Sequence, residues 1–127
     1  MRFGITRKTP RMTNYKAGDV VLIPFPFTDL TATKQRPAVI LSSNRFNRRQ
    51  GDIIIAAITS HIPEKLSRED YILSPVDQRS AGLPKLSIVK LGKIVTIDQQ
   101  LVRKRLGYLS PKTIKSIISS LFSRIFR

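Results

Sequence analysis

Short apolar runs alternate with polar, turn-rich segments along most of this chain. The runs that predict strands, rich in β-branched or aromatic residues, lie at 20–25, 38–41, 52–58, 70–73, 86–97 and 106–109. The longest of them, 86–97, is interpreted as two strands hinged at Gly92. Turn-forming residues gather at 42–51, 60–68 and 74–85 and predict turns and loops there. The pattern favours a β domain.

The last part of the chain changes to a helical period. Ser110 is a suitable N-cap, and Pro111 suits the first turn of a helix. Beyond them, apolar residues recur at helical spacing, at positions 114, 117, 118, 121 and 125. Short strands covered by one amphipathic helix predict a mainly β fold with a C-terminal helix. We expect a small, strongly bent, mostly antiparallel sheet or barrel.

Length and charge predict one domain that follows a tail. A chain of 127 residues is usual for a single domain. Residues 1–14 include four basic residues, no acidic residue and no apolar period, so we expect a basic flexible N-terminal tail there. The folded domain is then expected at 15–127. Met12 is an alternative start to Met1, because the organised pattern begins directly after it.

The composition points to an anionic partner and excludes several kinds of site. Lys and Arg number 23 against 8 Asp and Glu, which makes the net charge +15. This balance is typical of nucleic-acid binding and also suits an acidic protein; a solvated surface or membrane contact are the alternatives. There is no cysteine and a single histidine, His61, so thiolate and multi-histidine metal sites within one chain are excluded. No metal or other cofactor is expected. Neither a membrane span nor a signal peptide is indicated, so we expect a cytoplasmic protein.

The segment 18–43 contains the strongest candidate for a phosphate-binding residue. Two apolar runs are joined there by a polar loop, and Arg36-Pro37 opens the second run. A guanidinium can hold two phosphate oxygens at once, and the proline restricts Arg36 to extended backbone angles that fix the direction of its side chain. The alternative is structural, with Arg36 paired to Asp29 or Asp19.

Hydroxyl and imidazole groups follow the apolar run 52–58. Thr59 and Ser60 stand where the chain leaves the core, and hydroxyls there can donate to a phosphate oxygen; ordinary turn chemistry is the alternative. If the strand continues, His61 shares a face with Thr59 and can exchange a proton near neutral pH. The alternative for His61 is a surface or packing role.

A third group combines arginines with an aromatic ring. Arg45, Arg48 and Arg49 surround Phe46, and such a group can hold a single strand through phosphate pairing and base stacking. The alternative is a solvated loop whose Phe46 packs into the core. A glycine-rich phosphate loop, a nucleophile elbow and an obvious glycosidase carboxylate pair are all missing from the sequence.

The order of these motifs resembles the MazF/PemK/Kid family, the toxins of type II toxin–antitoxin pairs. The resemblance covers about residues 15–126 and rests on GDVVLIPFPFTDL, RPAVILS, DIIIAAITS, GLPKLSIVKLGKIVTID and LGYLS, followed by the helix. It implies an SH3-like small barrel and a homodimer with an RNA groove at its interface. It also implies a metal-independent endoribonuclease that cuts single-stranded mRNA and is silenced by an acidic antitoxin. A related toxin group with the same barrel architecture binds DNA gyrase.

The resemblance also implies site residues. Arg36 and Thr59 take the places of the family's catalytic arginine and threonine. Two departures are visible: Thr31 stands near the place where some relatives have a carboxylate, and the Arg-x-Asp triplet of the Kid branch is matched by Lys90 and Gly92. The residues expected to contact RNA are Asp29, Thr31, Lys34, Gln35, Ser60, Arg45, Phe46, Arg48, Lys85 and Lys90.

These residues support a specific hypothesis for the chemistry. An RNA 2′-hydroxyl can attack its own neighbouring phosphate, so no metal-bound water is required. Arg36 would clamp the phosphate and Thr59 would orient or bond it. His61 or water would supply the proton, because a guanidinium does not readily give one up. The alternative is an inactive module that binds nucleic acid or antitoxin, or a gyrase-binding toxin, on the same fold.

Overall fold

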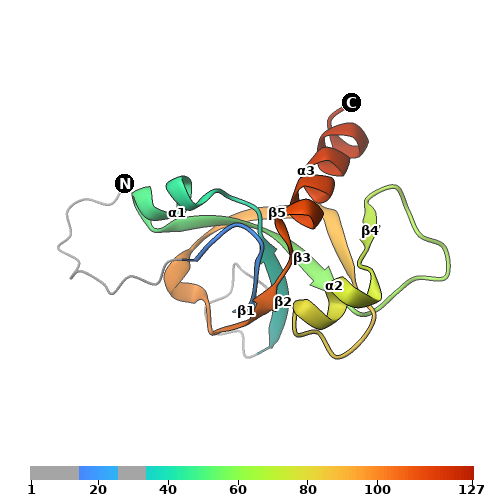
Figure 1. The fold of residues 1–127 in the computed structure, drawn as a ribbon, viewed down its shortest axis with the longest axis horizontal. Coiled ribbons are helices and arrows are strands. Elements are labelled where there is room, and N and C mark those ends of the chain that lie inside the picture. Colours follow the sequence, from blue (N-terminus) through green and yellow to red (C-terminus); the bar gives the residue numbers. More distant parts are fainter. Residues whose placement is uncertain (1–14, 26–33) are drawn as a thin grey trace.

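The fold is a bent antiparallel sheet with a helix against one face, in a computed structural model that describes residues 15–25 and 34–127 (Figure 1). Neighbouring strands follow the order β4-β5-β3-β2-β1-β6. The strands are β1 (Asp19–Pro24), β2 (Gln35–Ile40), β3 (Asp52–Thr59), β4 (Asp70–Ile72), β5 (Ile88–Asp98) and β6 (Lys104–Tyr108). The helices are α1 (Asn44–Gln50), α2 (Pro75–Ser80), the 3₁₀ turn η1 (Gln99–Leu101) and α3 (Pro111–Ile125). The predicted tail and the alternative start at Met12 lie outside the described residues.

The sheet buries apolar side chains on both of its faces. On one face, Ile58 of β3 and Val89 of β5 pack in a core that includes Ile117 of α3. On the other face, Ile40 of β2 and Ile55 of β3 belong to a second core. Successive residues of a strand point to opposite faces, and both faces are buried here. These strands are therefore nearly continuous apolar runs in the sequence. The strand order ends at β4 and β6, so the sheet is a small open barrel, and the predicted mainly β fold with a C-terminal helix is confirmed.

Helix α3 begins where the sequence predicts it. The Ser110 side chain accepts a hydrogen bond from the backbone N–H of Thr113 at 3.2 Å, which caps the first turn. Ile114 and Ile117 are buried on the face that meets the sheet. The predicted apolar stripe therefore covers the first core.

The prediction of two strands in 86–97 is wrong, because β5 is a single strand of 11 residues. Its pairing with β3 shifts register: Ile58 pairs with Val89, whereas Ala56 pairs with Ile94. The residues in between leave the β3 ladder, and Lys90 pairs with β4 on the other side. An irregularity of this kind bends a strand without ending it, so a glycine hinge at Gly92 is not needed.

Two of the three predicted loop segments contain short helices. In 42–51, helix α1 is capped by Ser43, whose side chain accepts from the N–H of Phe46, and ends at Gly51 in the left-handed region, with φ 78°. In 74–85, helix α2 is capped in the same way by Ser74. Neither helix has the long apolar stripe that reveals α3, and their capping residues are the same types that mark turns.

Candidate functional site

The pairing of β2 with β3 brings Arg36 and Thr59 to the same end of the sheet. The last paired residues there are Ala38 and Ala57, so Arg36, two residues before Ala38, and Thr59, two residues after Ala57, both lie beyond the last pair at this end. Alternate residues of a strand share a face, so Arg36 lies on the same face as Ala38 and Ile40. Arg36 therefore lies at the rim of the second core, at the end of the sheet where β3 ends with Thr59.

Arg36 lies within β2, which begins at Gln35, three residues before the predicted start of this strand at position 38. Its guanidinium carbon is 5.2 Å from the centroid of the Phe25 ring, within the range of a cation–π contact. Among the described residues, its Nε atom is buried and has no hydrogen-bond partner. Buried donors without a partner are rare in folded proteins, and a phosphate oxygen is one acceptor that would satisfy this one.

The structural alternative for Arg36 is wrong for one of its two proposed partners. Asp19 instead accepts from Arg105 of β6 at 2.9 Å and from the backbone N–H of Lys16 at 2.9 Å. The other proposed partner, Asp29, lies outside the described residues.

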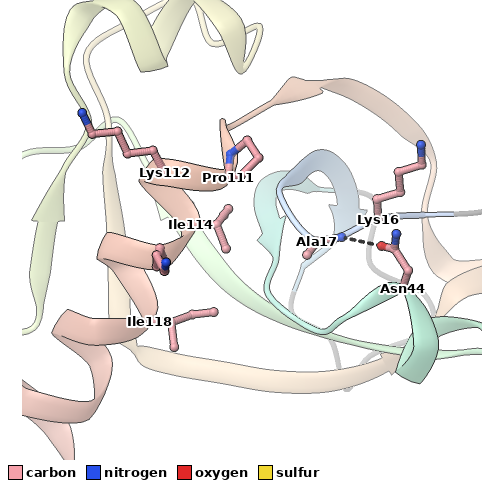
Figure 2. A pocket seen from close by; sticks show the side chains of 8 residues that line it. Lys16, Ala17, Asn44, Pro111, Lys112, Ile114 and Ile118 are labelled. Carbon is pink, nitrogen blue, oxygen red and sulfur yellow. Dashed lines mark hydrogen bonds between the residues drawn. The ribbon is translucent and has the colours of Figure 1, made fainter.

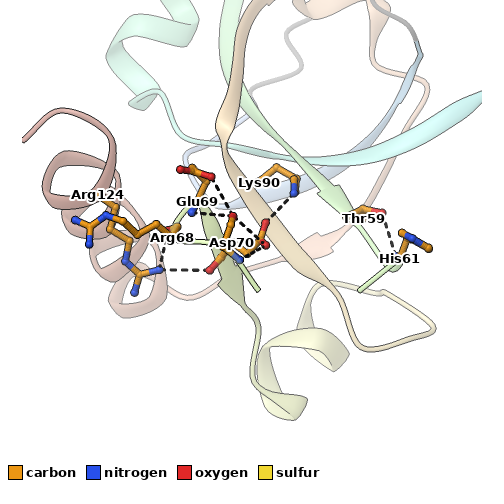
Figure 3. Close-up of polar contacts among 8 residues, drawn as sticks. Thr59, His61, Arg68, Glu69, Asp70, Lys90 and Arg124 are labelled. Carbon is orange, nitrogen blue, oxygen red and sulfur yellow. Dashed lines mark hydrogen bonds and ion pairs between the residues drawn. The ribbon is translucent and has the colours of Figure 1, made fainter. Parts of the chain in front are cut away.

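Thr59 is the last residue of β3, and its hydroxyl takes part in the turn that follows. The Thr59 Oγ1 atom accepts from the backbone N–H of His61 at 3.0 Å (Figure 3). The turn chemistry proposed as an alternative is therefore present. The hydroxyl makes no hydrogen bond as a donor to any described residue, so its proton can serve an incoming acceptor. Because β3 ends at Thr59, His61 does not continue the strand on the face of Thr59, although it is exposed two residues further on.

Lys90 of β5 forms an ion pair with Asp70 of β4. The Lys90 Nζ donates to Asp70 Oδ1 at 2.7 Å, and the side chains are 29% and 2% exposed, respectively. The hydrogen bond from Lys90, followed by one from the Ser67 backbone N–H, lowers the pKa of Asp70 below its ordinary value. Sequence reasoning missed Asp70, because only strand pairing brings it to Lys90.

Several residues predicted to bind RNA share this end of the sheet. Ile88 of β5 pairs with Thr59, so the segment that leads into β5 lies at the same end. The predicted RNA contacts here are Lys34, Gln35, Ser60, Lys85 and Lys90, all exposed except the half-buried Lys90. Asp29 and Thr31 lie outside the described residues.

The structure does not bring the arginine–phenylalanine group to this end. Arg45, Phe46 and Arg48 lie in α1, which connects the other ends of β2 and β3 (Figure 1). The length of β2 from Arg36 to Ile40 alone separates the two ends by about 13 Å, at about 3.3 Å per residue. Phe46 is 38% exposed, so the alternative in which it packs into the core is wrong.

A shallow groove lies at the N-terminal end of α3 (Figure 2). It is lined by Lys16, Ala17, Asn44, Pro111, Lys112, Ile114, Lys115 and Ile118. None of these residues was predicted from the sequence to belong to the site. Within the described part of the chain, no helix has the length and apolar content needed to cross a membrane.

A bent six-stranded sheet closed by a terminal helix defines a class of small β domains, and two comparisons with solved structures agree with this class. An endoribonuclease in complex with its cognate antitoxin from a mycobacterial species has a TM-score of 0.67 at 20% identity, covering 90% of this chain and 95% of that one. MazE–MazF from Deinococcus radiodurans has a TM-score of 0.69 at 19% identity, covering 87% of this chain and 95% of that one. At these identities the structures show the fold.

Sequence comparison identifies the family. The model of the PemK-like, MazF-like toxins of type II toxin–antitoxin systems matches residues 16–123. The chain is also 29% identical over 86 residues to the endoribonuclease MazF of Staphylococcus saprophyticus subsp. saprophyticus, covering 68% of this chain and 69% of that protein. The chain belongs to the PemK-like, MazF-like toxin family. The resemblance inferred from the motifs is confirmed.

Proposed function

We propose that the chain is the toxin of a type II toxin–antitoxin pair and a metal-independent endoribonuclease that cleaves single-stranded mRNA at short sequences. The observation that supports the proposal is the β2–β3 pairing that brings Arg36 and Thr59 to one end of the sheet, with an unpartnered, buried Nε on the arginine among the described residues. The name of the staphylococcal relative, an endoribonuclease, supports the same reaction.

Arg36 and Thr59 stabilise the phosphate as its charge increases. The guanidinium of Arg36 binds the non-bridging oxygens, and the Thr59 hydroxyl donates its proton to one of them. The hydrogen bond from the His61 N–H to Thr59 fixes the position of the hydroxyl before RNA arrives. Donors that are already oriented need no reorganisation when the transition state forms.

The RNA supplies its own nucleophile. The 2′-oxygen bonds to phosphorus and loses its proton to a base, while the bond from phosphorus to the 5′-oxygen breaks and that oxygen gains a proton. The products are a 2′,3′-cyclic phosphate and a 5′-hydroxyl. His61, exposed two residues after Thr59, or a water molecule provides the proton.

The proposed partners follow from charge and exposed apolar surface. A net charge of +15 suits both single-stranded RNA and an acidic antitoxin, and the mycobacterial relative was solved with its cognate antitoxin. Ile72, Val76 and Leu86 are between 46% and 61% exposed, and Ile72 pairs with Ile88, the partner of Thr59. This exposed apolar surface supports a homodimer that covers it. The protein would act in the cytoplasm, on mRNA.

The decisive experiment incubates the purified chain with long single-stranded RNA in the presence of EDTA and determines the chemistry of the new ends. We expect cleavage, with cyclic phosphate and 5′-hydroxyl termini. Cleavage that continues where the ribose at the cut site is replaced by deoxyribose contradicts the 2′-hydroxyl mechanism. A shift in RNA mobility without cleavage supports the non-catalytic binding module instead.

A further inference from the structure

The Lys90–Asp70 pair lies next to Thr59 in the sheet. Thr59 pairs with Ile88, and Lys90 lies two residues further along β5 on the same strand face. Lys90 is therefore one residue past Val89, the partner of Ile58, so its long side chain begins near the end of β3, at the point where the regular β3–β5 pairing is interrupted. Figure 3 shows β5 with Lys90 between β4, which carries Asp70, and the end of β3.

Both oxygens of the Asp70 carboxylate accept hydrogen bonds from neighbouring residues. Oδ1 accepts from Lys90, while Oδ2 accepts from the backbone N–H of Ser67 at 2.9 Å and from the Ser67 hydroxyl at 3.2 Å. Its side chain is only 2% exposed. This carboxylate is therefore held in one position and is shielded from solvent.

The backbone around Asp70 is also held, by the distant end of α3. Arg124 donates to the carbonyl oxygens of Asp70 and Arg68 at 3.3 and 3.4 Å, and Arg68 donates to the carbonyl oxygen of Ser123 at 3.3 Å (Figure 3). The start of β4 is thus attached to a helix more than 50 residues away in sequence. Asp70 is a rigid anchor for whatever it binds.

Lys90 keeps donors that the ion pair does not use. An ammonium group has three N–H donors, and one of them serves Asp70. The Lys90 side chain is 29% exposed, so it is partly accessible from outside. A lysine side chain is flexible on its own, and the bond to a fixed carboxylate limits the directions of the remaining donors.

We propose that Asp70 is a positioning residue for RNA cleavage, which holds the Lys90 ammonium so that its free N–H groups donate to the phosphate bound by Arg36 and Thr59. This inference rests on the proposed function. Lys90 transfers no proton in this role and adds positive charge beside the phosphate as the 2′-oxygen attacks.

If Asp70 acted only through its charge, its removal would help RNA binding. If it positions Lys90, its removal would slow turnover, so the two roles can be distinguished by experiment. A carboxylate near a bound polyanion repels it, so neutralising Asp70 should leave KM unchanged or lower it. A positioning residue instead affects turnover, because a displaced Lys90 no longer meets the phosphate in the transition state. A fall in kcat without a rise in KM is therefore the signature of the role, and a purely structural residue does not produce it in the folded fraction.

The experiment compares wild type, Asp70→Asn, Lys90→Gln, the double variant and the control Glu69→Gln, which neutralises the adjacent exposed carboxylate. Each is assayed on one single-stranded RNA, with rates referred to the folded fraction determined by circular dichroism. We expect Asp70→Asn and Lys90→Gln each to lower kcat by about 10- to 100-fold, since a displaced catalytic contact can cost about 100-fold. The double variant should lose no more than the worse single variant, because the two residues act as one unit. Glu69→Gln should behave as wild type.

The outcomes separate the inference from the function on which it rests. If wild type cleaves RNA and folded Asp70→Asn keeps the wild-type kcat, the positioning role is overturned and the proposed function stands. If wild type does not cleave, both are overturned. If Asp70→Asn does not fold, Lys90→Gln is compared with the double variant, which leaves no unpaired buried charge. Equal kcat values support the role, and a further loss in the double variant overturns it.

Discussion

Replacing Arg36 with alanine tests the proposed catalytic site most directly. The side chain combines a cation–π contact to Phe25 with an Nε atom that has no partner among the described residues. The fold would therefore lose little through its described contacts, whereas the phosphate would lose its clamp. We expect Arg36→Ala to remain folded and to be nearly inactive.

The expected losses of activity and of stability in Arg36→Ala differ enough in size to be distinguished by measurement. Loss of a donor that stabilises developing charge costs about 100- to 1,000-fold in kcat, or about 2.7–4 kcal/mol. Loss of the contact to Phe25 costs about 0.5–1 kcal/mol of unfolding free energy. For a domain of this size, 1 kcal/mol lowers Tm by only about 2–8 °C. A defect in activity should thus far exceed the defect in stability.

The assay follows single-turnover cleavage of a fluorescent single-stranded RNA, together with thermal unfolding of each variant. The control is Arg103→Ala, which removes the same charge from an exposed side chain between η1 and β6. We expect the control to cleave like wild type, which excludes a general effect of charge. Cleavage by folded Arg36→Ala at a rate close to the wild-type rate refutes the assignment of Arg36.

Three further predictions concern the packing of Gly107, the pH dependence of stability and the arginines of α1. A Cβ atom at Gly107 would lie 2.2 Å from the carbonyl oxygen of Ser80. In urea titrations, Gly107→Ala should therefore lower the unfolding free energy by about 1–3 kcal/mol. The control Gly92→Ala, whose Cβ would meet its nearest atom at 3.7 Å, should have little effect. Because the pKa of Asp70 is lowered in the fold, its ionised form stabilises the protein above the ordinary value of 3.8, and that contribution is lost as pH falls through the lower folded pKa. Unfolding free energy measured across this acidic range should depend less on pH in Asp70→Asn, and an unchanged slope contradicts the reasoning. Since α1 lies at the far end of β2, replacing Arg45 and Arg48 with alanine should leave the kcat for a short RNA unchanged, and a large loss would place α1 in the catalytic site.

Local sequence patterns were sufficient to predict the helices and strands that have a strong apolar period or a clear capping residue. Helix α3 was predictable because its apolar stripe and the Ser110-Pro111 start depend only on neighbouring residues. The strands were found from their apolar runs, although β2 begins before its apolar part, at Gln35. Helix α1 was missed, because its polar residues carry no period and its serine cap is also a turn residue.

Some residues of the candidate site could be predicted from the sequence, and others could not. Arg36 and Thr59 were recognisable as residues with suitable chemistry at strand ends, and the order of motifs added a family. The partner of Lys90 was not recognisable, because Asp70 is 20 residues away and meets it only through the β4–β5 register. Chain order could have separated Arg45, Phe46 and Arg48 from Arg36, because Arg36 opens the strand and their segment follows its other end.

The sequence by itself determined the class of fold, the strong positive charge and the residue types that can bind a phosphate. Apolar period, capping and net charge are properties of adjacent residues or of the whole composition, so they can be read without coordinates. Only the tertiary structure decided that β2 pairs with β3, which brings Arg36 and Thr59 to one end of the sheet, and that Asp70 holds Lys90. The physical reason is strand register, which depends on the pairing of distant segments and decides which side chains share a face.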